Sequence, residues 1–125
     1  MASVPPSPVL HLLRGMVEDA HTKGRSDEEL LRQWGAGRDA ACLHALVRRH
    51  GPLVMKVSRR VVGNHHDAED VFQTTFLVLA RKAASIRPRE MLANWLHGVA
   101  FNTALNARKL KTRRCGRERQ VRVLP

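Results

Sequence analysis

The sequence predicts an all-α protein, a compact bundle of four to five helices. Apolar residues recur three and four positions apart along most of the chain, which is the spacing of one helix face. Aromatic residues are scarce, with two Trp, three Phe and no Tyr, whereas leucine, alanine and valine are plentiful, which favours helix-on-helix packing over a β-sandwich. The 125 residues suffice for one domain with a modest core.

Residues 1–25 are predicted to be an N-terminal extension. Residues 1–8 are rich in proline and serine and are expected to be disordered, whereas residues 9–20 have the spacing of a short, weakly amphipathic helix. This apolar stretch is too short for a membrane span of ~20 residues and lacks the cleavage site of a signal peptide. We therefore expect a cytoplasmic protein that does not enter a membrane.

The predicted helical domain covers residues 26–112 and opens on a capping box, in which Ser26 and Glu29 satisfy free backbone donors of the first turn. That helix is expected to end near Gly35 and Gly37. A second helical pattern occupies residues 39–50. Pro52 is predicted to break or kink it before a further helix over 53–62, because proline removes a backbone donor and suits a first helical turn.

A long helix is predicted over residues 67–84, and a final helix from residue 94 to beyond residue 109. Residues 85–94 between them are predicted to form a loop, because Pro88 disfavours helix at Arg87. The final helix is expected to fray into residues 113–125, which form a basic tail or the start of a linker.

The helix over 67–84 has more patterned faces than a core requires. At ~100° per residue, one stripe contains Phe72, Phe76, Leu79 and Ala83, and a second contains Asp70, Gln73, Thr74 and Leu77. The first is the predicted core face. The second combines a carboxylate, an amide and an exposed leucine, which suits a protein contact. A simpler interpretation stays open, in which the acidic residues Asp67, Glu69 and Asp70 only complement the helix dipole.

The final helix carries a polar stripe beside a small apolar one. The polar stripe is Trp95, Val99, Asn102, Asn106 and Lys109, and the apolar stripe is Leu96, Ala100, Thr103 and Ala107. Asparagine can pair with adenine, tryptophan can stack on an unpaired base for ~1–3 kcal/mol, and lysine can neutralise phosphate. The combination indicates a helix at a junction between duplex and melted DNA. Alternatively, Trp95 only fills the edge of the bundle.

The net charge of +11 indicates a polyanionic partner, with nucleic acid first. Eight basic residues lie between Arg108 and Arg122, opposed only by Glu118, although a basic run can also be a solvated tail. The two cysteines have no metal-ligand spacing, and His65 and His66 have no further ligand at helical spacing, so no metal site is predicted. No catalytic constellation and no cofactor motif is recognised, so an enzyme is not expected.

The segments "DAEDVFQTTFLVL" and "NWLHGVAFNTALNARK" together resemble region 2 of the extracytoplasmic-function (ECF) sigma factors of bacterial RNA polymerase. The resemblance covers roughly Ser26 to Arg114 and implies a sigma region 2-like fold. It implies two partners: the clamp helices of the β′ subunit of core RNA polymerase, and the non-template strand of the promoter −10 element. An anti-sigma factor over the polymerase-binding face is a further partner that the resemblance suggests.

The resemblance also implies roles for individual residues. It assigns polymerase binding to the acidic helix, at Asp67, Asp70, Gln73, Thr74 and Leu77. It assigns DNA binding to the following loop and the last helix, at Arg81, Lys82, Ser85, Arg87, Arg89, Asn94, Trp95, Asn102, Asn106, Arg108 and Lys109.

Two residues depart from the family pattern, since Phe101 stands where many relatives have a basic residue and Asn106 where aspartate is common. Promoter preference therefore does not transfer. Members normally continue through a linker into a second helical domain that reads the −35 element, whereas this sequence stops at Pro125. Two rival functions stay open: a stand-alone basic helical nucleic-acid-binding protein, and an inactive, truncated sigma remnant.

Overall fold

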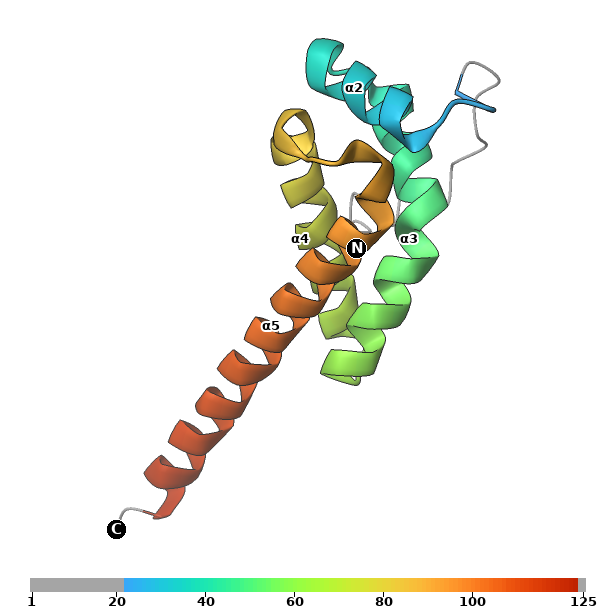
Figure 1. Ribbon diagram of the computed structural model, residues 1–125. Coiled ribbons are helices and arrows are strands. Elements are labelled where there is room, and N and C mark those ends of the chain that lie inside the picture. Colours follow the sequence, from blue (N-terminus) through green and yellow to red (C-terminus); the bar gives the residue numbers. More distant parts are fainter. Residues whose placement is uncertain (1–21, 124–125) are drawn as a thin grey trace, which may run out of the picture.

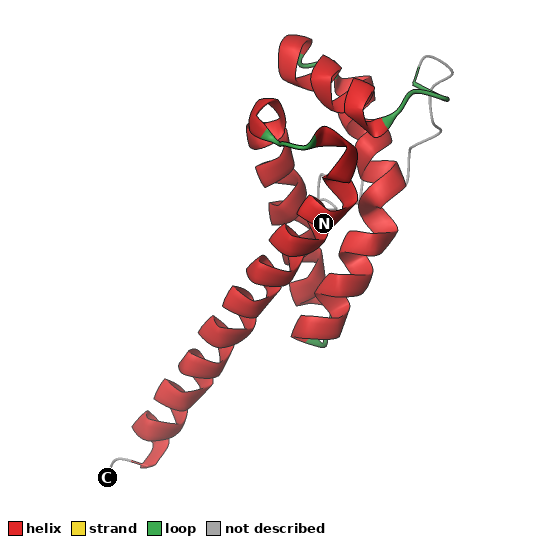
Figure 2. Cartoon of the chain, viewed as in Figure 1, coloured by secondary structure: helices red, strands yellow, loops and turns green. Residues whose placement is uncertain are grey.

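The structure, a computed structural model, describes residues 22–123, with side chains as far as Arg117. Its elements are α2 (Asp27–Gly37), α3 (Ala40–Val62), α4 (His65–Lys82), the 3₁₀ turns η1 (Ala83–Ser85) and η2 (Arg89–Met91), and α5 (Leu92–Val123) (Figure 1). Helices joined by short loops make up the whole described range (Figure 2). The expected all-α bundle is therefore confirmed, while the helix expected over residues 9–20 lies outside the described residues.

Side-chain caps fix where three of the helices begin. The Ser26 hydroxyl accepts a hydrogen bond from the backbone N–H of Glu29 at 3.2 Å, as the capping box predicts. Asp39 caps α3 in the same way, and the side-chain oxygen of Asn64 accepts from the N–H of Asp67 at 2.8 Å. Each cap satisfies a backbone donor that the first turn leaves without a partner.

Of the two effects predicted at Pro52, a break or a kink, the break is wrong, because α3 runs without interruption through Gly51 and Pro52. Proline forfeits one intrahelical hydrogen bond and crowds the preceding turn. Val47 and Val54, which flank it, are both buried in the same core. One continuous helix buries both halves of the apolar face, and this burial outweighs the local cost of proline.

The core lies where α3, α4 and α5 pack together, with α2 closing one end (Figure 1). The predicted core stripe of α4 is confirmed, since Phe72, Phe76, Leu79 and Ala83 are all buried. On α5 the fully buried residues are Leu92, Leu96, Ala100 and Ala104. The two small alanines let the α5 backbone approach its neighbours closely. Thr103 and Ala107, which the sequence places on the apolar stripe, are only half-buried.

Helix α5 is longer than predicted. The sequence predicts fraying into residues 113–125, but α5 stays helical to Val123 and projects well beyond the bundle (Figure 1). Every side chain from Arg108 to Arg117 is exposed. None of the described helices contains a stretch long and apolar enough to cross a membrane.

Candidate functional site

The second predicted stripe of α4 lies at the surface. Asp70 and Thr74 are exposed, Gln73 is half-buried, and the Leu77 side chain is 51% exposed. Leucine in the middle of a helix that already buries a full core stripe has no packing role at that exposure. The α4 surface therefore combines acidic, amide and apolar groups beside one another, as the periodicity predicts.

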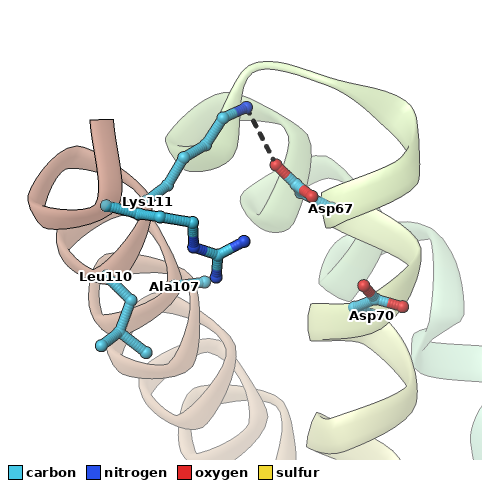
Figure 3. Close-up of a pocket in the computed structure, with 6 residues that line it drawn as sticks. Asp67, Asp70, Ala107, Leu110 and Lys111 are labelled. Atoms are coloured by element: carbon cyan, nitrogen blue, oxygen red, sulfur yellow. Dashed lines mark hydrogen bonds and ion pairs between the residues drawn. The ribbon is translucent and has the colours of Figure 1, made fainter. Parts of the chain in front are cut away.

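Asp67 differs from the rest of this stripe because its carboxylate is already engaged. It accepts hydrogen bonds from Asn64 Nδ2 at 2.7 Å and from Lys111 Nζ at 3.2 Å. The hydrogen bond from Asn64, and after it the one from Lys111, lowers the pKa of the Asp67 carboxyl below its ordinary value. Figure 3 shows the lysine reaching across from α5 to α4.

Both partners of Asp67 should affect its titration. We expect Asn64→Ala and Lys111→Ala each to raise the pKa of Asp67, because each removes a hydrogen bond to the carboxylate, and Lys111→Ala also removes a positive charge. Since the folded-state pKa is depressed, the associated stability is present above the ordinary value of 3.8 and is lost as the pH falls below it. Carboxyl ¹³C NMR titration of the variants measures both shifts, and an unchanged pKa in either variant would contradict this assignment.

The acidic end of α4 and the basic extension of α5 face each other across an open hollow of about 290 Å³. It is lined by Asp67, Asp70, Ala107, Leu110, Lys111 and Arg114 (Figure 3). The sequence assigned no role to Lys111 or Arg114. No local pattern could have found the ion pair, because its partners are 44 residues apart.

The connection between α4 and α5 is held by its own side chains. Ser85 Oγ donates to the Lys82 carbonyl at 2.9 Å, and Arg87 Nη1 donates to the carbonyls of Ile86 at 2.8 Å and Ala84 at 3.2 Å. Ile86 is buried in the core at the middle of this segment. The segment predicted as a loop over residues 85–94 contains the 3₁₀ turn η2 and ends earlier than predicted, because α5 begins at Leu92. Ser85 and Arg87 are exposed on it, and Arg81, Lys82 and Asn94 are exposed on the flanking helices.

Arg89 stands apart from these residues. Its side chain is half-buried, and its Nε atom is enclosed without a hydrogen-bond partner in the described part of the chain. A polar atom that loses its water without a replacement partner destabilises the fold. The connection therefore carries a local cost that a new partner for the guanidinium would remove.

The side chains of the polar stripe of α5 become more exposed along the helix. Trp95 is half-buried and packs against the core, as the edge-filling interpretation predicts, and Val99 is also half-buried. Asn102, Asn106 and Lys109 are exposed. The stripe from Trp95 to Asn106 spans about 16 Å at 1.5 Å per residue. Its first end belongs to the bundle, and its far end is free to contact a partner.

The same face continues into the extension. Arg113 and Arg117 follow Lys109 at spacings of four residues, so at ~100° per residue they fall about 20° to either side of the direction of Asn106. Both side chains are exposed. Amide and cationic groups thus occupy one continuous face of α5.

Residues 46–114 match the family model described as Sigma-70 region 2, a range that takes in α4, the connection and the first two-thirds of α5. The chain belongs to this family. The predicted resemblance is therefore confirmed, and the bundle is a sigma region 2 fold. The family is not an enzyme family. No group of three or more potential metal-ligating side chains occurs within the described residues.

The curated relatives are ECF sigma factors. The chain is 38% identical over 80 residues to the ECF RNA polymerase sigma factor SigE of Mycolicibacterium smegmatis, which covers 64% of this chain and 29% of SigE. It is 38% identical over 55 residues to the ECF RNA polymerase sigma factor SigG of Mycobacterium tuberculosis, covering 44% of this chain and 15% of SigG. The chain thus spans less than a third of either relative. No solved structure matches it.

Proposed function

We propose that the chain recognises and melts the promoter −10 element during transcription initiation, while bound to core RNA polymerase in the cytoplasm. The observation that carries this proposal is the family match over residues 46–114, which includes both patterned helices and the connection between them. Membership of the sigma region 2 family implies core polymerase as a partner. The geometry of the two exposed faces supports a division between polymerase and DNA.

The polymerase surface is proposed to be the outward stripe of α4, and its partner the clamp helices of the β′ subunit. Asp70, Thr74 and Leu77 offer a carboxylate, a hydroxyl and an exposed apolar side chain, and Gln73 lies between them at intermediate exposure. Buried apolar contacts surrounded by polar groups are typical of specific interfaces. Asp67 belongs at the edge of this surface, because its carboxylate already binds Lys111.

The connection after α4 is proposed to hold unpaired bases of the non-template strand. Removing a base from the stack costs a few kcal/mol per step, so the protein has to supply compensating contacts. Ser85, Arg87 and Arg89 offer polar groups in this segment, and Met91 adds an apolar surface that is 48% exposed. Arg81 and Lys82 lie beside them and suit the phosphates of the displaced strand.

The free face of α5 is proposed to contact the upstream edge of the element, where the DNA is still duplex. Asn102 and Asn106 present amides that can read base edges, and Asn94 and Trp95 lie at the end of the same helix nearest the connection. Arg108 and Lys109 begin the basic extension, which suits phosphates. Trp95 is half-buried and packs against the core, and the part of its ring that stays exposed is proposed to stack on a base.

The test uses core polymerase, the purified chain and a fork-shaped DNA with an unpaired non-template −10 strand. The complex should bind this DNA more tightly than core polymerase alone. Arg89→Met should reduce that binding while leaving the stability of the free chain unchanged or higher, because methionine keeps the apolar stem and removes the unsatisfied Nε. Anisotropy with labelled DNA and thermal unfolding measure the two effects.

Arg60→Met is the matched control, since it removes one exposed positive charge from α3. Equal loss with both variants would reduce the role of Arg89 to general charge. A chain that binds DNA equally well without polymerase would instead be the stand-alone nucleic-acid-binding protein. A folded chain that binds neither partner would be the inactive remnant.

A further inference from the structure

The C-terminal end of α2 is fastened to the last turn of α4 by two side chains. The Trp34 indole Nε1 donates to the Ala80 carbonyl at 2.9 Å, and Arg38 Nη1 donates to the same oxygen at 2.7 Å. The Arg38 guanidinium also lies over the Trp34 ring, 5.1 Å from its centroid. The Trp34 indole, the Arg38 guanidinium and the Ala80 carbonyl thus contact one another and join two helices that are distant in sequence. We call this contact the Ala80 clamp.

The Ala80 clamp lies where the chain leaves α4 and enters the connection. Ala80 lies two residues before Lys82, where α4 ends, and the η1 turn begins at Ala83. The last four carbonyls of a helix lack partners within it, so outside donors decide how the chain leaves the helix. Two donors on one carbonyl, one of them charged, fix this exit more firmly than a single neutral bond does.

Arg38 makes this contact from an unfavourable backbone conformation. It ends α2 with φ 55° and ψ 40°, in the left-handed region, and its N–H donates to the Trp34 carbonyl at 2.9 Å. Glycine adopts this region without penalty and is the usual residue there. An arginine held there indicates that the side chain makes a contact that compensates for the backbone cost. The Ala80 clamp is such a contact.

Helix α2 also packs directly on the connection that follows α4, against both η1 and η2. Gly35 faces Ala84, and a Cβ atom at Gly35 would lie 3.5 Å from the Ala84 Cα. The backbone of α2 therefore supports the side of residues 83–91 that faces the bundle. Ser85 and Arg87 remain exposed on this segment.

We propose that Trp34 and Arg38 are positioning residues for DNA capture, which hold residues 83–91 in the shape that accepts an unpaired base. They act through the Ala80 carbonyl and do not themselves contact DNA. This inference rests on the proposed function of the connection. It predicts that loosening the clamp impairs DNA capture without impairing polymerase binding, because neither substitution changes a side chain of the α4 stripe and Ala80 lies beyond Leu77, nearer the end of the helix.

The first experiment needs neither DNA nor polymerase. Arg38→Gly removes the guanidinium and also relieves the left-handed backbone, so the fold should survive. Trp34→Phe keeps an aromatic ring but removes the donor. We expect amide hydrogen exchange over residues 83–91 to accelerate roughly three- to tenfold in each variant, the range that corresponds to losing one net hydrogen bond. Unchanged exchange in both variants would overturn the clamp.

The second experiment measures binding of the fork-shaped DNA to the complex with core polymerase. Both clamp variants should weaken this binding several-fold more than Arg32→Ala, which removes an exposed charge from the same helix, while affinity for core polymerase stays at the wild-type value. Because Trp34→Phe changes no charge, a loss in Arg38→Gly alone would mean direct DNA contact by Arg38 and would overturn the proposal. Faster exchange without any loss of capture would overturn it as well.

A failure of the proposed function would give a different result from a failure of the Ala80 clamp. In that case the wild-type complex would bind the fork no better than core polymerase alone, whatever the clamp variants do. The exchange measurement would still decide whether Trp34 and Arg38 hold the connection, so the two hypotheses fail by different results.

Discussion

Replacing Asp70 and Gln73 together with alanine should lower the affinity of the chain for core RNA polymerase by roughly 30-fold or more. Hot-spot side chains near the centre of an interface contribute about 2 kcal/mol or more on truncation, and that free energy corresponds to about 30-fold in affinity. Asp70 is exposed and Gln73 half-buried on the outward stripe of α4. Fluorescence anisotropy with labelled chain measures the affinity, and circular dichroism checks that helicity is unchanged.

The control for this variant is Glu28→Ala, which removes an exposed carboxylate from α2 and leaves α4 intact. It should bind core polymerase like the wild type. Leu77→Ala should weaken binding in the same direction as the double variant with little loss of stability, because its side chain is already 51% exposed in the free chain. Wild-type affinity in the folded double variant would remove the α4 surface from the proposal.

The stripes on α4 and α5 were predictable because helix geometry is local. Once Asn64 and the acidic first turn define the start of a helix, a rotation of ~100° per residue assigns each side chain to a face. The buried Phe72 and the exposed Leu77 follow from that rule alone. The engagement of Asp67 does not, because Lys111 comes from a different helix, 44 residues further along the chain.

Contacts between helices that are far apart in sequence do not follow from local geometry, and for this reason the sequence analysis assigned no role to Trp34 and Arg38. Their shared acceptor lies 46 and 42 residues away, and it is a backbone carbonyl, which has no sequence signature. The left-handed conformation of Arg38 was equally hidden, since Gly37 beside it is the residue that the usual rule would select. Contacts that position a segment through its backbone therefore need the tertiary structure.

Two local rules were outweighed by tertiary structure or by helix continuity. Pro52 should interrupt α3, but residues on both sides of it pack into one core. The extension of α5 places like charges four residues apart, at Lys109 and Arg113 and again at Arg113 and Arg117. Such pairs destabilise a helix. The extension nevertheless continues as helix from the packed part of α5.

This repulsion has a consequence for binding. A helix whose charges repel one another gains most from a polyanion, because phosphates neutralise the charges while released counterions favour association. The exposed arginines Arg113 and Arg117 continue the face that carries Asn106 and Lys109. If duplex DNA lies along α5, as the proposed function places it, its phosphates would lie beside these side chains. We therefore expect the extension to supply a large, salt-dependent part of DNA affinity.

The triple variant Lys109→Gln, Arg113→Gln, Arg117→Gln measures that part. If each of the three side chains neutralises one phosphate, the slope of log affinity against log salt should become less steep by about 2.7, at ~0.9 per contact. At ~0.1 M salt this corresponds to roughly 500-fold weaker binding to duplex DNA. Titrations of a labelled duplex at several salt concentrations give the slope and the affinity together.

The matched control is Arg32→Gln, Lys56→Gln, Arg60→Gln, which removes the same charge from exposed positions on α2 and α3. Its slope should stay close to the wild-type slope, because counterion release depends on which charges contact phosphate and not on net charge alone. Equal slopes for the two triple variants would mean that the extension acts only as diffuse positive charge. A smaller slope for the α5 variant alone would place phosphates along the face that begins at Trp95 and would make α5 the axis on which the DNA lies.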